Sequence, residues 1–181
     1  MKKETATLAG GCFWCIEAVF KHLKGVQSAI SGYSGGSVEK AHYDDVSMGT
    51  TDHAEAIQIT FDPDIISFKT LLDVFWKLHD PTTLNRQGAD VGTQYRSVIF
   101  YHNKEQQKIA ESSKNEADKS GMYQDPIVTK IEPFEQFFKA EAHHQDYYDK
   151  NSSSNPYCRI VIDPKITKLY KEFKPLVKTE V

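Results

Sequence analysis

Residues 10–17, Gly-Gly-Cys-Phe-Trp-Cys-Ile-Glu, mark a turn from a strand into a helix. The apolar run at 6–9 predicts the strand, and apolar residues recur at helical spacing from Phe13 to Leu23. Cys12 therefore falls at the first helical position or next to it. Backbone N–H groups there have no partner within the helix, and the helix dipole is positive. We expect both features to lower the pKa of Cys12 and to make its thiol a nucleophile, with a buried, inert cysteine as the alternative.

The overall composition indicates a globular chain with a proper core. Of 181 residues, 39% are hydrophobic and 26% are charged, and the length suits one domain over residues 1–181. The formal net charge is −3 without a basic stripe, which argues against nucleic acid as the main partner. We expect a monomer.

The N-terminus and the cysteine count predict the cellular compartment. The apolar run after Met1-Lys2-Lys3 is too short for a signal peptide, and no stretch is long enough to cross a membrane. Three cysteines argue against a disulfide scaffold and for thiols that are kept reduced. We therefore expect a cytoplasmic protein without membrane contact.

Hydrophobic periodicity predicts that strands and helices alternate along the rest of the chain. Strands are expected at 26–30, 54–61, 95–101 and 127–131, and loops at 31–36 and 85–92. Helices are expected at 68–78 after the N-cap Ser67, at 103–120, from Phe134 towards Tyr148, and from Pro164 onward. This order favours an α/β (α+β) fold, a two-layer sandwich with a mixed sheet on a split βαβ, ferredoxin-like plait core.

Six motifs in order along the chain resemble those of the A-type peptide methionine sulfoxide reductases. They are Gly11-Cys12-Phe13-Trp14 with Glu17, Gly32-Tyr33-Ser34-Gly35-Gly36, His53-Ala54-Glu55-Ala56, Phe75-Trp76 with His79-Asp80-Pro81, Asn85-Arg86-Gln87-Gly88 with Asp90, and Gln94-Tyr95-Arg96-Ser97. The resemblance implies a mixed sheet in a two-layer α/β plait. It also implies reduction of the S epimer of methionine sulfoxide, free or within oxidised proteins and peptides.

The chemistry of a sulfoxide requires a thiolate that attacks sulfur and an acid that protonates oxygen. Cys12 is the expected nucleophile, and its product would be a sulfenic acid. Glu55 shares the register of Ile57 and Ile59, so it points towards the core, where burial holds a carboxyl neutral. The resemblance gives Glu55 the role of the acid, and a solvated strand-end glutamate is the alternative.

The other expected site residues are also assigned by the resemblance. Tyr43 and Tyr95 would donate hydrogen bonds to the sulfoxide oxygen, and Asp90 would orient the site. Phe13 and Trp14 would hold the methyl group of the substrate. The alternative for these aromatic residues is core packing without a functional role. The alternative for Asp90 is an ordinary residue of a turn.

The sulfenic acid needs a second thiol, and the sequence offers two. The Tyr-Cys setting of Cys158, on a predicted loop, resembles that of the family's resolving cysteine, so we expect a Cys12–Cys158 disulfide. Thioredoxin would reduce this disulfide as the external reductant, and no metal or other cofactor is implied. Cys15 is the rival, because Cys12 and Cys15 form a C-x-x-C pair.

Two other functions use the same cysteines. The first alternative is a thiol-disulfide oxidoreductase that uses Cys12 and Cys15. The second is a zinc module that adds His53, or His143 and His144, to these cysteines.

One position departs from the family pattern. Asp52 stands where relatives usually have Gly, and its charge would raise the pKa of Glu55 if the two carboxyls are close.

Overall fold

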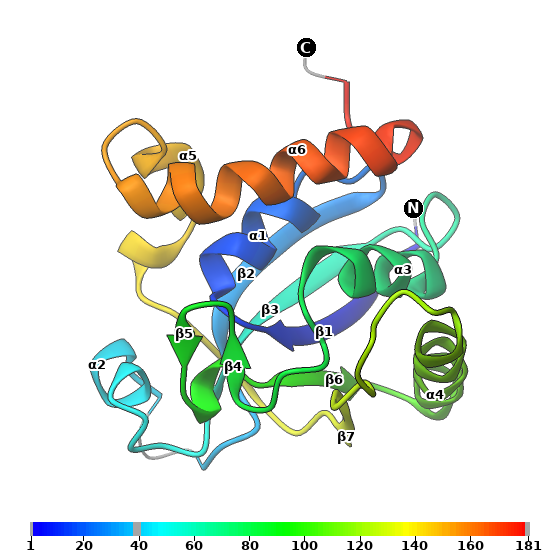
Figure 1. Ribbon diagram of the computed structural model, residues 1–181, viewed down its shortest axis with the longest axis horizontal. Coiled ribbons are helices and arrows are strands. Elements are labelled where there is room, and N and C mark those ends of the chain that lie inside the picture. Colours follow the sequence, from blue (N-terminus) through cyan, green and yellow to red (C-terminus); the bar gives the residue numbers. More distant parts are fainter. Residues whose placement is uncertain (1, 38–40, 180–181) are drawn as a thin grey trace.

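A computed structural model describes residues 2–37 and 41–179, which form a curved sheet with helices packed on it (Figure 1). The strands of the main sheet are β1 (Glu4–Gly10), β2 (Val26–Ser34), β3 (Ala54–Phe61), β6 (Ser97–Tyr101), β7 (Lys130–Pro133) and β8 (Phe137–Lys139). Their order is β7-β6-β1-β3-β2-β8. A separate ribbon pairs β4 (Arg86–Gln87) with β5 (Asp90–Val91) inside the expected 85–92 loop.

The centre of the sheet confirms the ferredoxin-like plait. Strand β3 pairs antiparallel with both β1 and β2, so β1 and β2 are parallel with β3 between them. The connection from β1 to β2 is α1 (Phe13–Phe20), which gives the split βαβ unit. The sheet is mixed because β7 joins β6 in parallel, whereas β8 joins β2 antiparallel.

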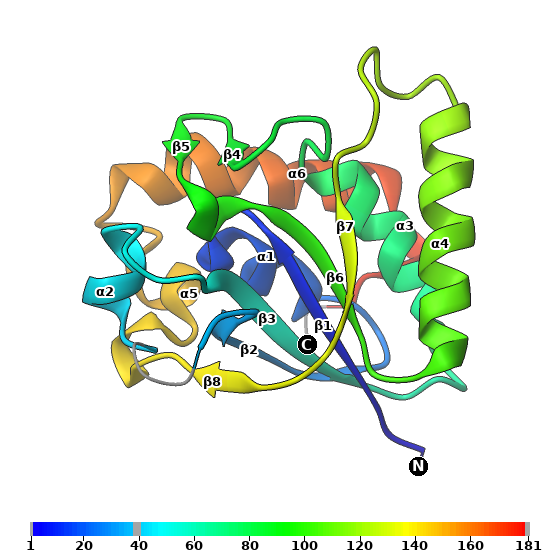
Figure 2. The same cartoon turned by 90° about the horizontal axis from the view of Figure 1, so that it is seen from below.

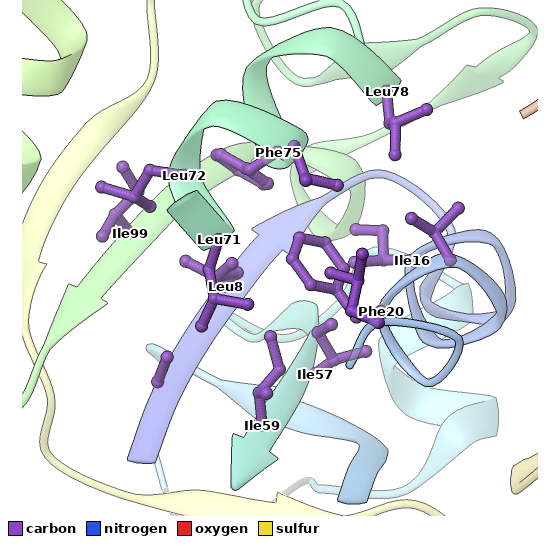
Figure 3. Packing of buried hydrophobic residues seen from close by; sticks show 14 of the residues in the cluster. Leu8, Ile16, Phe20, Ile57, Ile59, Leu71, Leu72, Phe75, Leu78 and Ile99 are labelled. Atoms are coloured by element: carbon purple, nitrogen blue, oxygen red, sulfur yellow. The ribbon is translucent and has the colours of Figure 1, made fainter. Parts of the chain in front are cut away.

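The main core lies between the sheet and the helices α1 and α3 (Phe68–Leu78). Ile57 and Ile59 of β3 point towards Phe20 of α1, and Leu8 of β1 lies under Leu71 of α3 (Figure 3). Ser67 caps α3 by accepting the Thr70 N–H at 3.1 Å, as expected. These contacts fix α1, and with it Cys12, against the middle strands.

The remaining helices surround this core (Figures 1 and 2). They are α2 (Tyr43–Ser47), α4 (Lys104–Lys119), α5 (Tyr147–Asn151) and α6 (Asp163–Glu172). The expected helices at 103–120 and from Pro164 onward are confirmed by α4 and α6. Among the described residues, no helix combines the length and the apolar character that a membrane span requires.

The predicted helix from Phe134 towards Tyr148 is wrong. Residues 137–139 form β8, which pairs with β2 through Tyr33↔Phe138, and a 3₁₀ turn at Ala142–His144 and α5 follow. Phe134 and Phe137 cover the second face of the sheet, where the strands carry small residues such as Ala54 and Ala56. Contacts distant in sequence thus override the helical spacing of these phenylalanines.

The glycine-rich stretch 31–36 is only partly a loop. Ser31–Ser34 belongs to β2 and pairs with β3. Gly32 is required there because an added Cβ would lie 2.4 Å from the Phe138 carbonyl oxygen of β8. The glycine therefore lets a neighbouring strand approach closely, as glycine inside strands often does.

Candidate active site

The turn from β1 into α1 presents Cys12 at the edge of the core. Gly11 has a φ of 100°, which favours glycine, and a Cβ there would lie 2.6 Å from the Gln87 side chain. Cys12 is the N-cap residue of α1 and retains 9% exposure. The predicted strand-to-helix turn at this cysteine is confirmed.

Glu55 caps the same helix from the neighbouring strand. It lies near the start of β3 opposite Tyr33, is only 2% exposed, and accepts the Phe13 N–H through Oε2 at 3.0 Å. Burial raises the pKa of Glu55 to about 8, with the charges of Asp90 and Cys15 adding to the shift and the Phe13 hydrogen bond opposing it. The predicted inward orientation is correct, and the carboxyl is protonated near neutral pH.

The expected low pKa of Cys12 is wrong for this structure. Burial raises the pKa of the Cys12 thiol, and the neighbouring Cys15 thiol and Glu55 carboxyl raise it further. Burial therefore outweighs the helix end, and one of the N–H groups at that end, that of Phe13, is directed at Glu55. The resting thiol is therefore held protonated.

Tyr43 and Tyr95 lie within electrostatic reach of Cys12 and Glu55, on different elements. Tyr43 is the first residue of α2, and Tyr95 ends the 3₁₀ turn before β6. Burial and the charge of Glu55 raise the pKa of Tyr43 to about 12, and the same causes raise the pKa of Tyr95. Both phenols therefore keep their protons and can donate them in hydrogen bonds.

The two aromatic residues after Cys12 differ in exposure. Phe13 is fully buried, and its ring centroid lies 6.4 Å from that of Tyr43. Trp14 is only partly buried and stacks on Tyr147, with ring centroids 3.7 Å apart and 6° between the planes. Phe13 thus packs from behind, whereas Trp14 has an accessible surface.

All three cysteines are free thiols in one apolar cluster. Cys158 is fully buried and begins a π-helical segment, Cys158–Ile162, so its predicted loop is wrong. Burial raises the pKa of Cys158, and the Cys15 thiol contributes to that shift. The segment continues directly into α6, and the packing of both against α1 is what holds Cys158 beneath the surface.

Tyr157 is a site residue that sequence reasoning missed. Its hydroxyl donates to Asp90 Oδ2 at 2.8 Å, and its oxygen lies 3.7 Å from the Cys15 sulfur. The same hydroxyl, which can donate its proton to one acceptor at a time, also lowers the pKa of Cys12 against the larger effect of burial. The only signal in the sequence was an aromatic residue directly before Cys158.

A pocket of about 320 Å³ opens beside these groups, lined by residues of the β4–β5 ribbon and of the segment that leads into α6. Cys12, Cys15, Asp90 and Tyr157 line it together with apolar residues such as Val161. The Cys12 thiol, the Asp90 carboxyl and the Tyr157 phenol thus border one space large enough for a small side chain.

The two open questions about metal and about Asp52 have structural answers. Among the described residues, the cluster with metal-ligand spacing is Glu141, His143 and His144, so it contains no cysteine and does not match the zinc module considered as an alternative. The charge of Asp52 acts on Arg96, whose guanidinium donates to the Asp52 carbonyl at 2.8 Å. The carboxyl that raises the pKa of Glu55 is Asp90.

A buried carboxyl beside a cysteine at a strand-to-helix turn, on a ferredoxin-like plait, is the arrangement that a thiol-based oxidoreductase requires. The family model of peptide methionine sulfoxide reductases matches residues 4–176, and the chain belongs to that family. It is 57% identical over 175 residues to peptide methionine sulfoxide reductase MsrA of Saccharolobus solfataricus, covering 97% of each chain.

Solved structures agree with this assignment. Reduced Mxr1 from Saccharomyces cerevisiae superposes with a TM-score of 0.79 at 38% identity, over 85% of this chain and 88% of that chain. Mxr1 in complex with Trx2 superposes with a TM-score of 0.58 at 29% identity, over 81% and 85%. The predicted family and fold are thereby confirmed.

Proposed function

We propose that this chain reduces the S epimer of methionine sulfoxide, free or in oxidised proteins and peptides. The Cys12 thiolate attacks the sulfoxide sulfur and forms a transient S–S bond, while Glu55 protonates the sulfoxide oxygen. The S–O bond of the substrate and the transient S–S bond then break as the oxygen moves to the Cys12 sulfur. Methionine leaves as the thioether and Cys12 becomes a sulfenic acid, so the oxygen atom passes from substrate to enzyme. Family membership and the order of the site motifs support this reaction.

The observation that carries the proposal is the burial of Glu55 at the end of α1 that presents Cys12. A sulfoxide oxygen is a poor leaving group unless it is protonated, and a solvated glutamate would be ionised at neutral pH. Glu55 is 2% exposed with a pKa of about 8, and it lies at the helix end that presents Cys12. The acid is therefore available beside the nucleophile.

The surrounding side chains suit the two ends of the sulfoxide group. The Tyr43 and Tyr95 phenols donate hydrogen bonds to the oxygen, and Asp90 orients the site through its effect on Glu55. The methyl group contacts the accessible surface of Trp14, and the fully buried Phe13 supports this subsite from behind.

Cys158 resolves the sulfenic acid in our proposal. Its thiol displaces water and forms a disulfide with Cys12, and a dithiol then exchanges with that disulfide. Thioredoxin fits as this reductant, because the similar yeast protein Mxr1 has been solved in complex with Trx2. Cys15 remains the rival resolver, since it lies in the same cluster as both other thiols. The electrons come from thiols, so no metal or organic cofactor is needed.

We infer further that residues 1–181 act as one catalytic domain, as a monomer in the cytoplasm. One main hydrophobic cluster includes residues from Ala6 to Val177, which supports a single domain. Three free thiols fit a compartment that keeps cysteines reduced.

An assay that resolves the epimers tests the reaction. Wild-type protein, thioredoxin and its reducing system are given racemic N-acetylmethionine sulfoxide, and each remaining epimer is quantified by chiral chromatography. We expect loss of the S epimer alone, no reduction by Cys12→Ser, and roughly 10²-fold or greater loss of kcat/KM in Glu55→Gln. Persistence of the S epimer with wild-type protein would refute the proposed function.

A further inference from the structure

Trp14 has a specific hydrogen-bond partner behind it. The indole Nε1–H of Trp14 donates to His144 Nδ1 at 3.2 Å, and the two rings lie nearly parallel with centroids 5.7 Å apart. His144 is only 3% exposed and also packs on Phe13 and Tyr43, at centroid distances of 5.6 and 4.1 Å. One imidazole thus contacts three of the residues around the substrate position.

The hydrogen bond fixes the protonation of His144. An indole N–H can only donate, so Nδ1 must accept and the proton of the neutral imidazole resides on Nε2. Protonating Nδ1 would bring two donors face to face and break the contact with Trp14. His143, Glu141 and Asp44 are the titratable groups that act on this imidazole, and burial lowers its pKa, which favours the neutral form.

Glu141 connects His144 to the other side of the site. Its Oε2 lies 3.5 Å from His144 Nε2, which has no closer partner among the described residues. The same carboxylate accepts the backbone N–H of Tyr43 through Oε1 at 3.1 Å and the Tyr33 hydroxyl through Oε2 at 3.2 Å. Glu141 therefore holds the first residue of α2 and faces the imidazole that holds Trp14.

A metal ion at this cluster would conflict with the hydrogen bonds. The candidate ligand atoms of Glu141, His143 and His144 lie within 4.8 Å of one another. A metal ligand must offer a lone pair, however, and Trp14 leaves the proton of His144 on the nitrogen that faces Glu141. The cluster is better explained by positioning than by metal binding.

We propose that Glu141 and His144 are positioning residues that fix the Trp14 indole plane and the start of α2 with Tyr43. The proposal rests on the proposed function, because it assigns these two residues to the methyl and oxygen subsites of that reaction. A rigid indole preserves the geometry of the methyl subsite, whereas a free one lets the substrate bind in unproductive poses. We therefore expect substitutions that remove the hydrogen bonds of Glu141 or His144 to raise KM more than they lower kcat.

Substitutions of His144 separate hydrogen bonding from packing. The amide oxygen that His144→Asn introduces can lie near the Nδ1 position and still accept from Trp14, whereas the side chain in His144→Leu cannot accept. His143→Gln is the matched control, because His143 is an exposed neighbouring histidine. Glu141→Leu is a second variant on a less buried side chain, in case His144→Leu fails to fold.

The first measurement is independent of activity. The chain has two tryptophans, so ¹H–¹⁵N spectra contain two indole signals, and Trp76, which donates to Ser113 at 2.8 Å, is the internal reference. In His144→Leu we expect the Trp14 indole proton to exchange with solvent at least about fivefold faster, the factor for one neutral hydrogen bond. His144→Asn and His143→Gln should leave this rate near that of the wild type.

The second measurement is the steady-state assay with the S epimer. We expect a KM about fivefold higher in His144→Leu and Glu141→Leu, with partial rescue in His144→Asn and no change in His143→Gln. An unchanged KM and indole exchange rate in His144→Leu would overturn the proposal. Equal KM values for His144→Asn and His144→Leu would also overturn it and assign His144 to packing. An inactive wild-type protein would instead refute the proposed function, and with it the catalytic purpose of this network.

Discussion

Replacing Glu55 by glutamine tests the central acid with a change that keeps shape and hydrogen bonding. The amide oxygen in Glu55→Gln can still accept the Phe13 N–H, which Glu55 accepts at 3.0 Å, but the amide cannot donate a titrating proton. The pKa of Glu55 is about 8 in the folded protein and 4.5 in its ordinary state. At a pH between these two pKa values, the native state therefore keeps a proton on Glu55 that the unfolded state has released.

The sign of the stability effect follows from this difference. Because the pKa is raised on folding, the contribution of Glu55 to the free energy of unfolding is complete below pH 4.5 and is lost as the pH rises through 8. Between pH 5.5 and 8.5 the loss amounts to about 3 kcal/mol by linkage. The buried position of Glu55, at 2% exposure, leaves little solvent screening to reduce this effect.

Urea unfolding of the wild type and of Glu55→Gln at both pH values measures the effect. The other titrating groups are common to both proteins, so the difference between their pH dependences isolates Glu55. We expect the wild type to lose about 3 kcal/mol more than Glu55→Gln between pH 5.5 and 8.5. Parallel curves for the two proteins would show that Glu55 is ionised throughout, and the acid role would then fail.

The remaining predictions concern the thiols and Tyr157. Thiolate absorbance measured against pH should show a Cys12 pKa above that of a free cysteine, and this titration should be missing in Cys12→Ser. A Cys12 pKa equal to that of a free cysteine would contradict the effect of burial on this thiol. Cys158→Ser should complete one turnover and then stop with thioredoxin, whereas Cys15→Ser continues, and the reverse result makes Cys15 the resolver. Tyr157→Phe should raise the Cys12 pKa and lower unfolding stability by about 1 kcal/mol, and an unchanged Cys12 titration would refute its hydrogen-bonding role.

The sequence predicted the elements whose signals are local. Ser67 and the apolar spacing of 68–78 define α3, and the alternation in 54–61 defines β3 and the inward register of Glu55. Residues 134–148 failed because β8 is defined by pairing with β2, and no local pattern records that pairing. The strand at Ser31–Ser34 was missed for the same reason.

The site residues show the same difference between local signals and contacts that are distant in sequence. Family motifs named Cys12, Glu55 and Asp90, but Tyr157 has a role only because the segment before α6 folds back onto Asp90. A hydrogen bond between residues 67 positions apart leaves no spacing signal in the chain. The contact from Trp14 to His144 spans 130 positions and was equally invisible.

The prediction of a low Cys12 pKa was wrong because two buried acids, Cys12 and Glu55, lie at the N-terminal end of α1. The positive end of α1 was expected to favour the Cys12 thiolate, but the Phe13 N–H at that end donates to Glu55. Two weak acids then lie at one buried helix end, where burial raises the pKa of both and the Glu55 carboxyl raises the pKa of Cys12 further. An acid for the sulfoxide oxygen is thus available before the substrate arrives, at the expense of the thiolate. Since the proposed reaction also requires a thiolate, Cys12 must lose its proton before it attacks the sulfoxide sulfur.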